Sequence, residues 1–273
     1  MSTIEIDKAS GVDRPTQTKI LSKEERAAIA ESLRARDIDF GLFPYPNGRD
    51  TTRLEPFRDR IESVALPAIA KIADELPIKN VHIGVFDAPE AVIPELGNRG
   101  QAHGYEIGKK YSQVEVDLDP ESEHRETAMG EDLERTLRHE LYHDARMDAL
   151  GEDGYRTLLD VIVFDGLATQ YEIEGSNDEP SPYAVALTPD QIPVLLAKAR
   201  KDFSKVFTSE DISSRDEWYW GSEEKNIPKW TVYALGHYLV GEYLKAHPGA
   251  KASTLYAIPA EEFIKSFDEN HKK

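Results

Sequence analysis

The sequence contains no cysteine. This absence excludes disulfide scaffolds, cysteine nucleophiles, iron–sulfur clusters and zinc sites built on thiolates. Any metal ion that the chain binds must therefore be held by histidine, aspartate or glutamate. The sequence has eight histidines, so each histidine with a metal-ligand spacing is worth examining.

Positive charge is also scarce. Lysine and arginine total 33 against 51 acidic residues, and the formal net charge is −18. Binding to nucleic acid relies on clustered lysine and arginine, and an anionic membrane surface repels a chain of this charge. We therefore expect neither nucleic acid nor membrane among the partners.

Long hydrophobic runs are missing as well. The longest apolar stretch, "LLDVIVF" at 158–164, is too short to span a bilayer and contains Asp160. The first 19 residues lack the apolar region of a secretory signal, so we expect a cytoplasmic location. The remaining composition, 40% hydrophobic and 31% charged, is typical of a globular chain that can bury a core.

Two segments in the first half of the chain have strand patterns. They are "VHIGVF" at 81–86 and "QVEVDLD" at 113–119, and the second alternates apolar and acidic residues. Such alternation predicts a half-buried strand and suits the edge of a sheet. An edge strand can bind an extended peptide, although plain sheet structure is the alternative interpretation.

Helical periodicity dominates the rest of the chain. Ser22 and Glu25 form a capping-box pattern at the start of one helix, and Pro67 predicts a kink or break in another. The acidic and aromatic segment 207–230 predicts a long loop, with "RDEWYWG" as a lid or hydrophobic anchor. The predicted helices cover 22–36, 56–76, 130–149, 154–175, 190–205, 229–247 and 258–268.

A segment rich in proline, glycine and asparagine at 43–56 predicts a boundary. Residues 1–50 are then a polar N-terminal tail with a short helix at the periphery, and residues 51–273 form a single domain. The order of elements predicts an α+β fold, in which a small mixed or antiparallel sheet is followed by a mostly helical half.

The string "HELYH" provides the first candidate site. On a helix, His139 and His143 lie one turn apart on one face and can bind the same ion. Glu140 is rotated about 100° around the axis and can reach a water on that ion, as in zinc sites where glutamate is the general base. The alternative is a solvated, charged helix face that matches the pattern by chance.

A third ligand is needed for a catalytic zinc site, and Asp165 in "FDGLA" is the candidate. Its helix is apolar on most sides, and a buried carboxylate is costly unless it is paired or binds a metal. A buried N-cap or salt-bridge partner is the alternative. Gly166 allows a second helix to approach closely. Asp160 is a candidate partner for a ligand histidine, whereas Glu172, two turns beyond Asp165, is expected to lie too far away to share the site.

Four segments in this order resemble a family of predicted zinc-dependent proteases catalogued as a domain of unknown function, within the gluzincin branch of zinc peptidases. The resemblance covers roughly residues 80–268 and implies a zincin-like metallopeptidase fold with one Zn²⁺ per chain, held by His139, His143 and Asp165. The third ligand of that pattern is normally glutamate, so the shorter Asp165 requires its helix to lie closer to the ion. The segments are "VHIGVFDAPEAVIPELGNRGQAHG", "LRHELYHDARM", "LLDVIVFDGLATQYE" and "IPKWTVYALGHYLVGEYLKAHPGA".

The fourth segment contains Tyr233 and His237, which share one helix face. Gluzincin-type peptidases commonly use a tyrosine or histidine to hold the oxyanion of the tetrahedral intermediate. The resemblance implies this role for one of the two residues. The alternative is a core tyrosine and a buried histidine with satisfied hydrogen bonds.

Taken together, these patterns predict a zinc-dependent peptidase with a peptide or protein substrate and Glu140 as the general base. The rival hypothesis is a non-catalytic zinc-binding regulatory or protein-interaction domain with a decayed protease site. A helical protein without a metal would require "HELYH" to be a coincidence. Two histidines and a carboxylate also describe non-haem iron sites, and the position of Glu140 favours zinc. The oligomeric state stays open.

Overall fold

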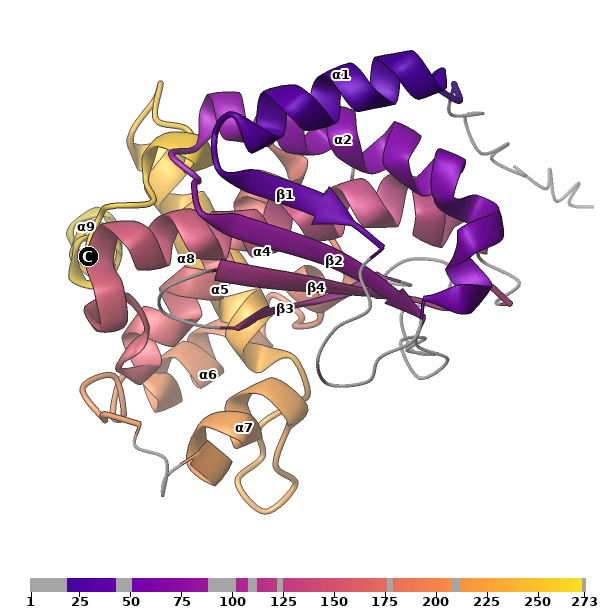
Figure 1. Cartoon of the computed structure of the whole chain (residues 1–273). Helices are drawn as coiled ribbons and strands as arrows, with labels where there is room; N and C mark the ends of the chain where they lie inside the picture. Colours follow the sequence, from indigo (N-terminus) through magenta and orange to yellow (C-terminus); the bar gives the residue numbers. More distant parts are fainter. Residues whose placement is uncertain are drawn as a thin grey trace, which may run out of the picture.

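A computed structural model describes residues 19–42, 51–87, 102–107, 112–121, 125–175, 179–207 and 212–271. Three parts of the predicted organisation lie outside these ranges: residues 1–18 of the N-terminal tail, residues 43–50 of the predicted boundary loop at 43–56, and residues 88–101 of the first resemblance segment. The described residues form an α+β fold with one four-stranded sheet (Figure 1). No helix among them is both long and apolar enough to cross a bilayer.

The sheet is mixed, with the strand order β1–β2–β4–β3. β1 pairs with β2 and β2 pairs with β4 in parallel, whereas β3 is antiparallel to β4. Both predicted strands are confirmed, but the predicted edge position of 113–119 is wrong because β4 lies between β2 and β3. The strands are β1 (Ile38–Gly41), β2 (Val81–Asp87), β3 (Ala102–Ile107) and β4 (Ser112–Leu118).

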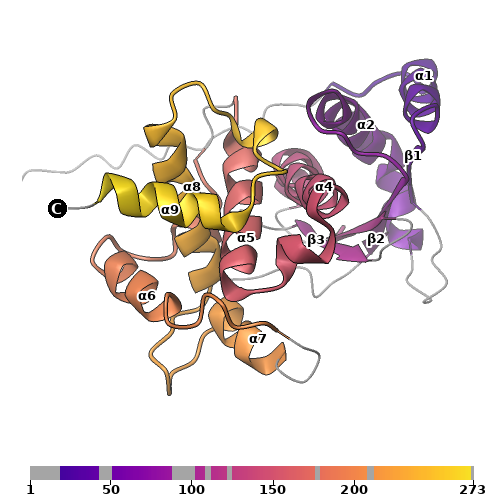
Figure 2. The ribbon, with the colours of Figure 1, turned by 90° about the vertical axis from the view of Figure 1, so that its left-hand side faces the viewer.

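The helices pack on the sheet and on one another, and α4 contacts both β3 and β4 on one side and α5 on another. Figure 2 shows α4 between the sheet and the group α5 to α9. The helices are α1 (Lys23–Arg34), α2 (Arg58–Glu75), α3 (Arg125–Thr127), α4 (Leu133–Leu150), α5 (Leu158–Ile173), α6 (Gln191–Ala199), α7 (Ile212–Trp220), α8 (Thr231–Ala246) and α9 (Ala260–Asn270). Short helical turns are η1 (Thr52–Phe57), η4 (Ala128–Asp132), η5 (Gly151–Tyr155), η6 (Pro182–Val185) and η7 (Ala252–Thr254).

Of the kink or break predicted at Pro67, the break is wrong, because α2 continues through this residue from Arg58 to Glu75. A kink at Pro67 stays a prediction. Pro67 removes one backbone hydrogen bond, but it lies on the exposed face of the helix. Ile61 and Ile69 lie on the buried side and are fully inaccessible to solvent. Packing of this apolar face therefore outweighs the cost of the proline.

The predicted loop at 207–230 contains a helix, α7, which the sequence analysis missed. Trp218 is buried and Trp220 is 57% exposed. On an extended lid the two indoles would point to the same side. Here one indole is buried and the other faces solvent. The helices α5 and α6 are also shorter than predicted: a capping box at Thr157 starts α5, and turns follow α6 from residue 200 onward.

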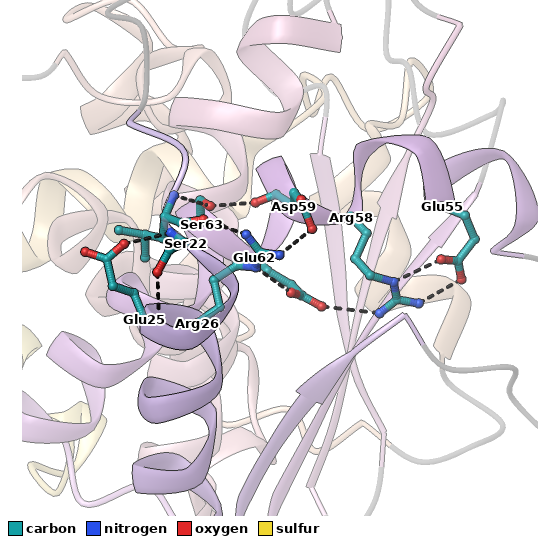
Figure 3. Close-up of polar contacts among 9 residues, drawn as sticks. Ser22, Glu25, Arg26, Glu55, Arg58, Asp59, Glu62 and Ser63 are labelled. Atoms are coloured by element: carbon teal, nitrogen blue, oxygen red, sulfur yellow. Dashed lines mark hydrogen bonds and ion pairs between the residues drawn. The ribbon is translucent and has the colours of Figure 1, made fainter.

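The predicted capping box at the start of α1 is confirmed. The backbone N–H of Glu25 donates to Ser22 Oγ (3.1 Å), and the backbone N–H of Ser22 donates to Glu25 Oε2 (2.7 Å). Arg26 then joins α1 to α2, since its buried guanidinium contacts Asp59 and donates to Glu62 Oε2 at 2.9 Å (Figure 3). The first helix is thereby fixed against the second.

Residues 38–41 after α1 form strand β1, and Ile38 is fully buried in the core. Part of the segment 1–50 is therefore paired with the sheet at β2. The proposed division into residues 1–50 and 51–273 stays a prediction, because residues 43–50 lie outside the described part of the chain.

The helices α5 and α8 approach each other closely where Gly166 meets Gly236. A Cβ atom placed on Gly166 would lie 2.3 Å from the carbonyl carbon of Gly236, and one placed on Gly236 would lie 2.1 Å from the carbonyl oxygen of Ile162. Neither position has room for a side chain, so the two backbones are in direct contact. The close approach that Gly166 predicted is confirmed.

Replacing Gly236 with alanine should force α5 and α8 apart. We expect Gly236→Ala to lower the free energy of unfolding by about 1–3 kcal/mol or more, the range for overpacked cores. Gly241→Ala is the matched control on α8, because its Cβ would meet a flexible side-chain atom, Gln170 Nε2, at 3.0 Å. Urea unfolding measures both variants, and equal losses would contradict the crossing.

Candidate metal centre

Three of the predicted residues converge between α4 and α5. The Nε2 atoms of His139 and His143 each lie 3.7 Å from Oδ1 of Asp165. These donor atoms all lie within 4.8 Å of one another, and the side chains are buried. The structure therefore brings two imidazoles and one carboxylate to a single point.

The geometry of these donors fits one small divalent ion. Zinc bonds of 2.0–2.2 Å in tetrahedral geometry place two donor atoms about 3.3–3.5 Å apart. The observed 3.7 Å needs only a small adjustment of side-chain torsions. Two histidines and a carboxylate leave one tetrahedral position for water or substrate.

The two histidines differ in charge. Burial by itself lowers the pKa of His139, but Asp165 and Glu172 outweigh burial and raise this pKa to about 10. Burial lowers the pKa of His143 well below its usual value, and the positive charges of His139 and Arg146 lower it further. His143 is therefore neutral, whereas a metal ion that binds His139 Nε2 must displace a proton.

Glu140 is buried beside His139 on α4. Burial raises the pKa of its carboxyl group to about 7; His139 opposes this shift, while Asp165 and Glu172 add to it. A pKa near the operating pH is suited to accepting and returning a proton. A cation bound nearby would favour the carboxylate form.

A contact between Glu172 and His139 corrects two expectations. Glu172 Oε1 lies 2.6 Å from Nδ1 of His139, so the prediction that Glu172 lies too far away to share the site is wrong. Asp160 does not partner a ligand histidine, because its carboxylate accepts hydrogen bonds from the N–H and hydroxyl of Thr157 at the start of α5.

The direction of the helices explains why Glu172 is the partner. His143 on α4 stacks on Phe164, near the middle of α5, at a ring separation of 3.9 Å. His139, one turn earlier on α4, meets Glu172, which is later on α5. The two helices therefore run in opposite senses. An antiparallel pairing of the two predicted helices would have indicated Glu172, since it lies seven residues after Asp165 on the same face.

Tyr233 and His237 lie one turn apart on α8 but in different surroundings. The Tyr233 ring centroid is 6.4 Å from that of His139 and 5.4 Å from that of Tyr219. Burial raises the pKa of Tyr233 well above its usual value, and Asp165 and Glu140 raise it further, so its hydroxyl stays protonated. His237 Nδ1 lies 3.2 Å from Thr169 Oγ1, and burial lowers its pKa.

Tyr219 is a site residue that the sequence analysis missed. Its hydroxyl donates to Asp165 Oδ2 at 2.6 Å and lies 3.2 Å from the hydroxyl of Tyr155. This bond leaves Asp165 Oδ1 facing the two histidines. No sequence pattern indicates this role, because the segment that carries Tyr219 has the composition of a loop.

Removing the Tyr219 hydroxyl should loosen Asp165. We expect Tyr219→Phe to weaken zinc binding about 10-fold, at the lower end of the 10–100-fold effect of residues that orient metal ligands. Tyr171→Phe is the matched control, because that hydroxyl also donates to a carboxylate, Glu75, but touches none of the three donors. Chelator competition measures both affinities; equal effects would assign Tyr219 a purely structural role.

The comparisons with known proteins can be set against this geometry. A family model described as a predicted Zn-dependent protease (DUF2268) matches residues 118–265, which include the whole candidate centre. No curated protein and no solved structure matches the chain. Because the match covers more than half of the 273 residues, the chain belongs to this family of predicted Zn-dependent proteases.

Proposed function

We propose that the protein is a zinc-dependent peptidase of the gluzincin type, with one Zn²⁺ held by His139, His143 and Asp165. The observation that carries the proposal is the convergence of two Nε2 atoms on one carboxylate oxygen in a buried site. The family description supports zinc as the ion and a peptide or protein as the substrate.

When bound, zinc polarises the substrate carbonyl and lowers the pKa of a water molecule. Glu140 takes the proton of the attacking water on its carboxylate and returns it to the nitrogen of the leaving amine. Burial raises the pKa of Glu140 to about 7 without a metal, and a bound cation would favour the carboxylate form that accepts the proton. Glu140 is therefore the proposed general base and then the general acid.

The proposed oxyanion donor is the hydroxyl of Tyr233. Its ring is tilted against that of His139, and its raised pKa keeps the proton on the oxygen. His237 is the second candidate for this role, one turn further along α8, where its Nδ1 faces Thr169. The ring contact with His139 favours Tyr233.

In the proposed zincin-like arrangement, the backbone of the substrate would bind along the edge of the sheet. β3 is an edge strand in the described part of the sheet, and it contacts α4, which carries both histidines. An extended peptide would pair with β3, in place of the segment 113–119 that the sequence suggested, because β4 is already paired on both sides.

The first test of this proposal is metal content. We expect about one zinc per chain by native mass spectrometry, because three protein donors converge on one point, and we expect His143→Ala to lose it. His271→Ala, which removes an exposed histidine, is the control and should keep the metal. A folded wild-type protein that takes up no zinc on addition would reject the proposed site.

The second test separates hydrolysis from metal binding. Glu140→Gln should keep zinc and lose about 10²–10⁴-fold in the rate of peptide cleavage, the usual contribution of a general acid–base residue. Glu134→Gln, an exposed change on the same helix, should cleave at the wild-type rate. A peptide library with mass-spectrometric readout measures both. A zinc-loaded wild-type protein that cleaves nothing would instead support the non-catalytic zinc-binding domain.

A further inference from the structure

Glu172 is a buried carboxylate that the proposed reaction does not use. Its side chain is fully inaccessible to solvent, and among the described residues it forms polar contacts with the side chains of His139, Ser181 and Tyr183. Oε1 lies 2.6 Å from His139 Nδ1 and accepts from the hydroxyl of Tyr183 at 2.8 Å. Oε2 accepts from Ser181 Oγ. Both oxygens are engaged, so the carboxylate cannot rotate.

We propose that Glu172 is a positioning residue for His139, and that Ser181 and Tyr183 hold Glu172 in place. This inference rests on the proposed metal site. A histidine that binds metal through one ring nitrogen usually donates its other N–H to an acceptor, which fixes the ring and its tautomer. Here the acceptor on Nδ1 aims Nε2 of His139 at Asp165.

The contacts of Glu172 indicate that its carboxylate holds the His139 ring in place. Burying a charged group costs several kcal/mol. The hydroxyls of Ser181 and Tyr183, in the segment after α5, donate hydrogen bonds to the Glu172 carboxylate and offset part of this cost. The same Tyr183 ring stands edge-on to the His139 ring, at a centroid separation of 6.2 Å and an angle of 88°. Tyr183 therefore restricts the movement of both the Glu172 carboxylate and the His139 imidazole.

His143 is held in another way, which makes the effect of Glu172 specific. Its ring stacks on Phe164 with an interplanar angle of 4°. Its Nδ1 has no hydrogen-bond partner among the described residues. Loss of the Glu172 carboxylate should therefore disturb His139 and leave His143 stacked.

The first experiment compares Glu172→Gln with Glu174→Gln. Glu174 is the matched control, because its carboxylate accepts two hydrogen bonds from Ser253 but, in the described part of the chain, forms no hydrogen bond or ion pair with the proposed metal-binding side chains. Zinc affinity is measured by chelator competition, and coordination geometry by the visible spectrum of the Co²⁺-substituted protein. We expect Glu172→Gln to weaken zinc binding about 10–100-fold and to shift the cobalt bands, with the control unchanged in both.

A structural role alone would lower the thermal stability of Glu172→Gln without moving the zinc affinity or the cobalt spectrum of the folded protein. That outcome overturns the inference. If Glu172→Gln does not fold, Ser181→Ala and Tyr183→Phe take its place, since each removes one donor and keeps the carboxylate. A weakening of zinc binding of about 2–10-fold in both, below the full effect of the carboxylate, supports the inference, and wild-type affinity in both overturns it.

A third readout does not depend on the metal. In the metal-free protein, the His139 Nδ1–H should give a hydrogen-bonded proton signal at low field in the NMR spectrum. This signal should move upfield or vanish in Glu172→Gln, because an amide oxygen is a weaker acceptor than a carboxylate, and it should be unchanged in Glu174→Gln. Its absence from the wild type overturns the inference whatever the zinc content. If the wild type shows this signal but takes up no zinc, the peptidase proposal fails while the contact between Glu172 and His139 stands.

Discussion

The arrangement of the helical half depends on one constraint, the backbone contact between Gly166 and Gly236. It fixes where α8 crosses α5, directly beside Asp165 and one turn from Tyr233. Almost every residue of α5 is buried, so this helix has no solvent face on which to shift. Because glycine at both positions allows this crossing, it fixes Asp165 on α5 and Tyr233 on α8 relative to each other.

Burial and the charges of neighbouring side chains together determine the electrostatics of the centre. His139, Glu140 and Asp165 are all buried, and the pKa shifts of His139 and Glu140 come from this burial together with the neighbouring charges. Hydroxyl groups supply the local order: Tyr219 orients Asp165, and Tyr183 orients Glu172. The tyrosines around the donors therefore act as a rigid frame of hydrogen-bond donors in a site of net negative charge.

The sequence predicted what depends on local periodicity. The spacing of His139 and His143, the capping box at Ser22 and the alternation in 113–119 each follow from one element, and the structure contains each of them. The features that it missed depend on contacts between elements. Whether 113–119 is an edge depends on β3, the partner of His139 depends on the sense of α5 relative to α4, and the continuity of α2 through Pro67 depends on what packs behind it.

The paired strand β1 has a consequence for any shorter version of this chain. The family match begins at residue 118, yet the sheet against which α4 packs is made by residues 38–41, 81–87, 102–107 and 112–118. A fragment limited to residues 118–265 would retain the three metal-binding side chains but lose β3 and α2, which pack against α4 in the whole chain. Residues 118–265 alone would therefore lack the partners of a buried helix face, and we expect this fragment to aggregate when it is expressed without the sheet.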